Sequence, residues 1–235
     1  MLNSQQQNSE YKYEILPDDY GESDLNFKII VIGDSGVGKS CLTTKATKNI
    51  FEESYNATVG FEFFNYNIKI EDKIIRLQIW DTCGQELYRS LITNFYRNSS
   101  LAVVVYAVNQ RETFEDVDMW LRELRKNSNP DVKVFIIGNK VDLVDERTVT
   151  KEEGEAFVKK NKLGKYFEAS AKTGINTQEI FIDAAMILYQ NYLKYNTYLN
   201  EIPDIEDKKN NNNKSFDKGN IEISIDDDKK RVCCF

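Results

Sequence analysis

The chain has 235 residues and contains no histidine. This excludes Ser-His-Asp and Cys-His catalysis, so any chemistry must depend on carboxylates, amides, lysine, backbone donors or a bound cation. The formal net charge is −7, but residues 1–25 hold six acidic side chains against one lysine, and residues 196–235 hold nine against seven basic ones. The middle of the chain is therefore neutral and offers no broad positive field for nucleic acid.

Residues 1–25 are rich in Gln, Asn and acidic residues without sustained periodicity, which predicts a flexible extension. A strand is expected near residues 26–32, followed by a helix from about 39 to 48. Two β-rich runs then predict an antiparallel hairpin, formed by Phe61–Ile70 and Lys73–Trp80. No apolar stretch is long enough to span a membrane, and four cysteines without zinc or disulfide spacing indicate a reducing cytosol.

Strands and helices alternate in the second half of the chain. The expected strands are Leu101–Ala107, Val132–Ile137 and Lys165–Ala169, and the expected helices are Thr113–Asn127, Thr150–Asn161 and Thr177–Tyr192, with Thr150 as an N-cap. This order predicts an α/β fold with a mostly parallel six-stranded sheet, one antiparallel edge hairpin strand, and helices on both faces. Residues 26–195 form the predicted domain, and residues 196–235 a disordered tail.

The segment Gly33–Ser40 matches the pattern G-x-x-x-x-G-K-S/T between a predicted strand and a predicted helix. Its glycines allow backbone N–H groups to turn toward phosphate oxygens, and the helix presents its positive end there. The alternative is a tight turn without a ligand. On the functional interpretation, Lys39 reaches the outer phosphates and Ser40 binds Mg²⁺. The expected phosphate contacts are Asp34, Ser35, Gly36, Val37, Gly38, Lys39, Ser40 and Cys41.

Two further motifs are expected at strand ends, where ligands of such sheets bind. After the second hairpin strand, Asp81 can hold Mg²⁺, Gly84 can bring a backbone N–H to the terminal phosphate, and Gln85 can orient an attacking water. Alone, the Asp is more often a turn residue and the Gln a surface amide. The position of both residues downstream of a phosphate loop favours the functional interpretation.

The segment Asn139-Lys140-Val141-Asp142 follows another strand. Asp142 can accept two hydrogen bonds from guanine, whereas adenine has neither donor. Hydrogen bonds to a charged group are worth roughly 1.5–3 kcal/mol each, so the pair predicts about two to four decades of selectivity. Asn139 would contact the base and brace loops, and the Lys140 stem would cover the purine face. The remaining guanine contacts are expected at Ser170, Ala171 and Lys172.

These four motifs, in this order and spacing, resemble the Ras-like small GTPases over about residues 26–195. The resemblance implies a P-loop NTPase fold, Mg²⁺ as cofactor, binding of GTP and GDP, slow hydrolysis and two nucleotide-dependent conformations. Carried over by position, Thr58 binds Mg²⁺ and the γ-phosphate, and Phe51 lies beside the guanine. Cys83 departs from the usual alanine before Gly84, and we expect it to affect loop packing or the hydrolysis rate.

Within this superfamily, several segments are similar to the Rab branch, which governs vesicle traffic. Phe63, Trp80 and Tyr88 match an aromatic triad that binds effectors, although the same side chains also suit a hydrophobic core. The ending Cys233-Cys234-Phe235 matches the double-cysteine Rab terminus rather than C-a-a-X, because Val occupies position 232. Two geranylgeranyl chains would allow stable anchoring where one lipid is marginal.

The resemblance implies a monomer at the cytoplasmic face of an intracellular or plasma membrane, with a cytosolic pool. It also implies an exchange factor, a GTPase-activating protein, a GDP-dissociation inhibitor, an escort protein with geranylgeranyl transferase, and GTP-dependent effectors. Two alternatives stay open: a Ras- or Rho-like signalling GTPase, and a nucleotide-binding module with little turnover. A P-loop kinase has no use for the Asn139–Asp142 motif.

Overall fold

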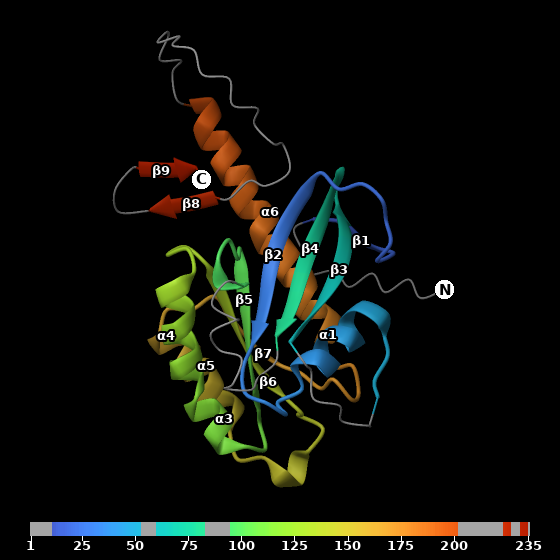
Figure 1. The fold of residues 1–235 in the computed structure, drawn as a ribbon, viewed down its shortest axis with the longest axis vertical. Helices are drawn as coiled ribbons and strands as arrows, with labels where there is room; N and C mark the ends of the chain where they lie inside the picture. The colour runs from blue at the N-terminus through green and yellow to red at the C-terminus, as the bar shows by residue number, and fades with distance from the viewer. Residues whose placement is uncertain (1–10, 53–59, 83–94, 202–222, 227–230, 235) are drawn as a thin grey trace.

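The computed structural model describes residues 11–52, 60–82, 95–201, 223–226 and 231–234 (Figure 1). Seven strands form the main sheet: β1 (Tyr13–Leu16), β2 (Leu25–Ile32), β3 (Phe61–Ile70), β4 (Lys73–Thr82), β5 (Leu101–Ala107), β6 (Lys133–Asn139) and β7 (Lys165–Glu168). The helices are α1 (Lys39–Lys48), α3 (Arg111–Glu115), α4 (Val117–Asn127), α5 (Lys151–Lys160) and α6 (Thr177–Glu201), with a short 3-10 turn, η2 (Val144–Glu146).

The strand order is β1-β3-β4-β2-β5-β6-β7, and β2, β4, β5, β6 and β7 run parallel. The two outer strands beyond β4 are antiparallel, β3 to β4 and β1 to β3. In Figure 1 the sheet separates α1 and α6 from α3, α4 and α5. The predicted α/β class, the mostly parallel sheet and the helices on both faces are therefore confirmed.

The two faces of the sheet bury alternate residues of the same strands. In β2, Ile29 and Val31 pack with α1 and α6, whereas Ile30 and Ile32 pack with α4 and α5. Period-two alternation places successive side chains on opposite faces, so a strand covered on both sides needs an unbroken apolar run. Such a run identified β5 from the sequence, and every residue of β5 is buried.

The structure corrects the prediction for the first 25 residues. Tyr13–Leu16 form an edge strand that pairs antiparallel with β3, so this part of the segment is not a flexible extension and the sheet has seven strands rather than six. The fully buried Asn67 side chain of β3 donates to the carbonyl oxygens of Pro17 and Asp18 at 2.7 and 3.2 Å. A four-residue strand carries too little periodicity of its own to be recognised, and its partner supplies its order.

Two further predictions need correction. The expected helix 113–127 is divided at Asp116, whose N–H bonds to both Glu112 and Phe114 carbonyls at the end of α3. The last helix continues to Glu201, and residues 223–226 and 231–234 pair as strands β8 and β9, so the predicted disordered tail does not describe these residues. Within the described part of the chain, no helix is long and apolar enough to cross a membrane.

The predicted N-cap of α5 is confirmed. Thr150 accepts a hydrogen bond from the Glu153 N–H, and the Glu153 side chain accepts one from the Thr150 N–H, which together form a capping box. Helix α5 follows the loop after β6, so the cap defines where that loop ends.

Candidate functional site

The predicted site segments converge at the carboxyl ends of the parallel strands. The loop 33–38 follows β2, Asp81 is the second-last residue of β4, Asn139 ends β6, and Ser170 follows β7. In Figure 1 these strand ends point to the same edge of the sheet, next to the start of α1. The topology therefore builds one site from segments that span 140 positions of sequence.

Lys39, predicted to contact phosphates, lies inside the loop that follows β2. The loop curls around the Lys39 ammonium, which is 5% exposed and donates to the carbonyl oxygens of Gly33 and Asp34 at 2.9 and 2.7 Å. Gly38, at φ 93°, precedes α1 as N-cap and offers no side-chain acceptor to the helix. The first N–H groups of a helix have no partner within it, so a start of α1 without a side-chain cap, beside the buried Lys39, suits phosphate oxygens.

Gly33 allows the loop to leave the sheet. Its φ is 139°, and a Cβ at this position would lie 2.1 Å from the backbone oxygen of Val105 in β5. No side chain fits at that distance, so glycine is required for the close approach of the loop to the neighbouring strand.

Ser40 and Asp81 form the candidate metal site. The Ser40 hydroxyl donates a short hydrogen bond to Asp81 Oδ2, and Asp81 is fully buried. Among the described residues, Asp81 Oδ1 has no hydrogen-bond partner. Burial raises the pKa of the Asp81 carboxyl to about 6, a shift that the Ser40 hydrogen bond and nearby Lys39 oppose.

A buried carboxylate oxygen without a partner is costly. A hydroxyl and a carboxylate supply the oxygen ligands that Mg²⁺ prefers, and the cation takes its other ligands from phosphates and water. The residues present therefore fit the predicted cation, and the unpartnered Oδ1 is the observation that indicates it.

Asn139 connects three of the converging segments. Its side chain is 1% exposed, Nδ2 donates to Val37 O at 2.8 Å, and Oδ1 accepts from the Ala171 N–H at 3.1 Å. The predicted bracing role of Asn139 agrees with these bonds. The N–H of Ala171, a predicted guanine contact, donates to Asn139 in this structure.

The predicted base-reading residues Asp142 and Ser170 lie together. Ser170 Oγ donates to Asp142 Oδ1 at 2.5 Å and accepts from the Thr173 N–H at 3.0 Å, so the hydroxyl orients the carboxylate. Lys140 has φ 68° and is half-buried, and burial lowers the pKa of its ammonium. Its apolar stem can cover a planar base.

Sequence reasoning missed the partner of Asp34. The indole Nε1 of Trp120 in α4 donates to Asp34 Oδ1 at 2.7 Å, and this bond fastens the phosphate loop to a helix on one face of the sheet. Burial, helped by the nearby Asp116 charge, raises the pKa of the Asp34 carboxyl. No sequence pattern links two residues that are 86 positions apart.

The aromatic surface is larger than predicted. Phe63 is 45% exposed and packs edge-on against Trp80 with ring centroids 5.3 Å apart. Phe61, 47% exposed, and Phe95 also contact the Trp80 ring, which adds two aromatic side chains to the predicted surface. Phe61 and Phe63 are therefore exposed, whereas Trp80 and Phe95 are partly buried.

Two further predicted residues lie in or just after α1, and others fall outside the described residues. Phe51 is half-buried and packs against the core on the side of α1 and α6. Cys41, in α1, is partly buried, and burial raises the pKa of its thiol. Thr58, Cys83, Gly84, Gln85 and Tyr88 fall outside the described residues. The backbones of Cys233 and Cys234 lie in β9.

The comparison with known families agrees with this geometry. The model of the Ras family matches residues 28–190, more than half of the chain. The matched region begins in β2, before the phosphate loop, and ends in α6, after the Ser170–Lys172 segment. Members of that family bind guanine nucleotides with Mg²⁺, which is the ligand set that Lys39, Asp81 and Asp142 suit. The chain belongs to the Ras family of small GTPases.

Proposed function

We propose that the chain is a Rab-type GTPase that cycles between GDP-bound and GTP-bound states, hydrolyses GTP and recruits effectors to membranes in vesicle trafficking. The single observation that supports the nucleotide cycle is the buried Ser40–Asp81 pair beside Lys39, with one carboxylate oxygen left without a partner among the described residues. A cation site placed next to a phosphate cradle suits phosphoryl transfer.

Each residue has a distinct role in this cycle. Lys39 would neutralise the outer phosphates, and Ser40 and Asp81 would hold Mg²⁺, which would supply positive charge to the phosphate oxygens. Gln85 orients the attacking water through its amide, which needs no proton-transfer pKa of its own. Thr58 and the Gly84 N–H contact the γ-phosphate, so their segments change conformation when it leaves.

Guanine selectivity rests on Asp142. Its carboxylate accepts from the two guanine N–H groups that adenine lacks, and Ser170 holds it in orientation. When adenine takes the place of guanine, the Asp142 carboxylate loses these two donors, which predicts about two to four decades of discrimination in affinity. Phe51, Lys140, Ala171 and Lys172 complete the base site in this proposal.

Single-turnover GTP hydrolysis tests the enzymatic part of the proposal. The wild-type protein, loaded with GTP and started with Mg²⁺, should hydrolyse its nucleotide, and Gln85→Leu should be slower by on the order of tenfold or more. Gln78→Leu is the matched control, because Gln78 lies inside β4 and has no predicted contact with nucleotide. If wild type and Gln85→Leu hydrolyse GTP at the same slow rate, the alternative of a nucleotide-binding module with little turnover is favoured instead.

The exposed rings of Phe61 and Phe63 support the effector role, because large apolar side chains that stay in water mark interaction sites. Together with Trp80 and Tyr88, they form the surface that GTP-dependent effectors bind in this proposal. An exchange factor and a GTPase-activating protein act on the same cycle. An escort protein with geranylgeranyl transferase modifies Cys233 and Cys234, and a GDP-dissociation inhibitor maintains the cytosolic pool.

Intact mass of the protein isolated from cells tests the membrane part. Two prenyl groups that disappear in the Cys233/Cys234→Ser variant are expected for the Rab branch. A Cys41→Ser variant should keep both groups, since Cys41 lies in α1 rather than at the terminus. Unmodified terminal cysteines contradict the anchor and favour a different branch. Imaging the same variants identifies the membrane.

A further inference from the structure

A buried tyrosine and a half-buried tyrosine lie in contact beside the base-reading segments. Tyr106 of β5 and Tyr166 of β7 flank β6, and their hydroxyl oxygens are 2.9 Å apart. Tyr106 is fully buried, and Phe114 packs on its ring at a centroid distance of 4.8 Å. Gly138 and Gly154 border the same space.

Both glycines are needed to admit the tyrosines. A Cβ on Gly138 would lie 2.8 Å from the Tyr106 hydroxyl and 2.9 Å from the Tyr166 hydroxyl. A Cβ on Gly154 would lie 2.4 Å from the Tyr166 ring. Any side chain at either position would have to displace a ring or its hydroxyl, so this space is shaped for the pair.

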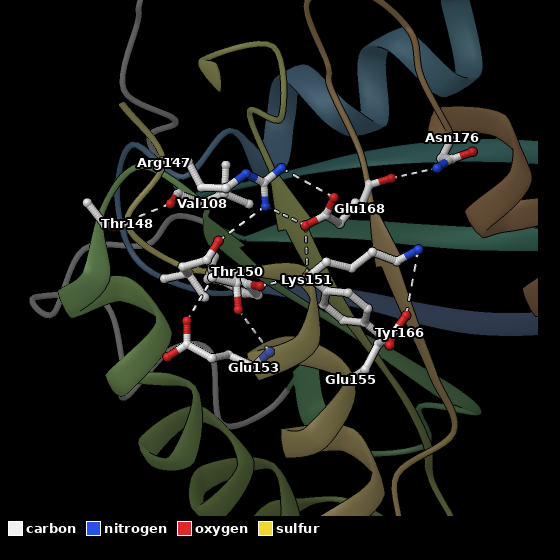
Figure 2. Close-up of polar contacts among 12 residues, drawn as sticks. Val108, Arg147, Thr148, Thr150, Lys151, Glu153, Glu155, Tyr166, Glu168 and Asn176 are labelled. Carbon is white, nitrogen blue, oxygen red and sulfur yellow. Dashed lines mark hydrogen bonds and ion pairs between the residues drawn. The ribbon is translucent and has the colours of Figure 1, made fainter. Parts of the chain in front are cut away.

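The hydroxyl chain continues to an ion pair. Tyr166 OH donates to Glu168 Oε1 at 3.3 Å, and Arg147 binds both oxygens of that carboxylate, at 2.6 and 3.3 Å (Figure 2). An ionised carboxylate only accepts, so Tyr166 donates to it and Tyr106 must donate to Tyr166. Burial raises the pKa of Tyr106 to about 12, which keeps this donor neutral. The Arg147 and Glu168 side chains are only 26% and 19% exposed, so water screens their attraction weakly.

The Arg147–Glu168 ion pair, which ends this series of hydrogen bonds, connects to both base-reading segments. Glu168 directly precedes Ala169 and Ser170, and its carbonyl accepts from Asn176 Nδ2 at 2.6 Å, which closes the 168–176 loop (Figure 2). Arg147 donates to Val149 O at 3.1 Å, and the Val149 N–H donates to Val108 O at 3.0 Å. The Val108 N–H in turn donates to Asn139 O at 2.9 Å, so the ion pair connects to Asn139 through this backbone.

We propose that Tyr106, Tyr166, Glu168 and Arg147 form a brace that positions the two guanine-reading segments, 139–142 and 170–172, and so sets how long a guanine nucleotide stays bound. The proposal rests on the proposed function, because it requires those segments to hold guanine. The four brace residues are positioning residues, which act through Asp142, Ser170 and Asn139. Hydrogen bonds weaken steeply with distance and angle, so a small shift of either loop weakens every base contact at once.

The brace also contributes to base selectivity. Asp142 gains its preference for guanine over a base without the 2-amino group only if its carboxylate lies at hydrogen-bond distance. A loosened 170–172 segment moves Ser170, which orients that carboxylate. Loss of the brace should therefore reduce the preference for GDP over IDP, and a general loss of packing would leave this ratio unchanged.

The test measures dissociation of a fluorescent GDP from the full-length protein with Mg²⁺. Tyr166→Phe should accelerate dissociation on the order of tenfold, since it removes the hydrogen bond to a charged acceptor. Glu168→Gln should accelerate it at least as much, and Tyr166→Phe should add little in the Glu168→Gln background because the two residues act as one chain. The ratio of GDP to IDP affinity should fall in both single variants.

Tyr66→Phe is the matched control. Tyr66 is 3% exposed in β3, and its hydroxyl has no hydrogen-bond partner among the described residues. Removing that hydroxyl should change neither the dissociation rate nor the GDP to IDP ratio. Thermal unfolding of each variant without nucleotide establishes that it is folded.

Three outcomes would overturn the inference. Folded Tyr166→Phe and Glu168→Gln proteins that release GDP at the wild-type rate show that the brace does not set residence time. Equal acceleration in Tyr66→Phe shows a general effect of core hydroxyls. Additive effects in the double variant show that the tyrosine and the ion pair act separately. A wild-type protein that binds no guanine nucleotide instead overturns the proposed function itself, which distinguishes the two failures.

Discussion

The Asn67 side chain should bind the first segment of the chain to the sheet. Its Nδ2 donates to Pro17 O at 2.7 Å and to Asp18 O at 3.2 Å, and its Oδ1 accepts from Arg76 Nε at 2.9 Å. Arg76 in turn donates to the carbonyl oxygens of Tyr20 and Gly21. A buried amide that satisfies three partners links residues 17–21 to the hairpin of β3 and β4.

The loss in free energy of unfolding expected for Asn67→Ala follows from these bonds. The two bonds to the carbonyls of Pro17 and Asp18 are worth about 1 kcal/mol each, because these exposed residues regain water when the amide is lost. The bond from the Arg76 guanidinium is worth roughly 1.5–3 kcal/mol. Asn67→Ala should therefore lower the free energy of unfolding of the full-length protein by about 4 kcal/mol.

Urea unfolding, followed by tryptophan fluorescence at one fixed concentration of Mg²⁺ and GDP, measures this cost. The same substitution is then made in a protein that lacks residues 1–22. There the carbonyl partners are gone, so Asn67→Ala should cost about 2 kcal/mol less than in the full-length chain. Asn65→Ala is the matched control, because Asn65 lies in the same strand and is only partly buried.

An equal cost of Asn67→Ala in the full-length and shortened proteins would refute the reasoning, since the amide would then not hold residues 17–21. An equal cost of Asn65→Ala and Asn67→Ala in the full-length protein would also refute it. Either result would assign the buried amide to the hairpin alone.

Three further predictions concern other parts of the molecule. Thr150→Ala removes the capping box of α5 and should cost about 1 kcal/mol in urea unfolding, whereas no change would mean that the cap is redundant. Gly33→Ala should destabilise the protein far more than Gly36→Ala, because only at Gly33 does a Cβ meet a backbone oxygen; equal costs would leave backbone strain as the only cause. In metal-free and nucleotide-free protein, the Asp81 carboxyl has its pKa raised from 3.8 to about 6, so its contribution to stability is full below pH 4 and is lost as the pH rises through 6. Asp81→Asn should therefore gain on the order of 3 kcal/mol relative to wild type between pH 4 and pH 8, measured in EDTA, and a pH-independent difference would contradict this origin.

Local signals in the sequence predicted most of the elements that carry the site. The apolar run of β5 and the capping box of α5 depend on residues within one segment, and both are confirmed. The phosphate-loop motif depends on contiguous residues as well, and the structure buries Lys39 inside that loop and sets Ser40 against Asp81. Strand ends in a parallel sheet meet at one edge, so the convergence of the motifs also followed from the order of the elements.

Other features were decided only by the tertiary structure, because they depend on residues that are far apart in the chain. The edge strand β1 has four residues and no period of its own, and its order comes from pairing with β3. The bond from Trp120 to Asp34 and the contact between Tyr106 and Tyr166 join side chains that are 86 and 60 positions apart. A side chain's identity states what it can bond to, but not which distant group folding will bring within 3 Å, because that distance is set by the packing of the whole sheet and its helices.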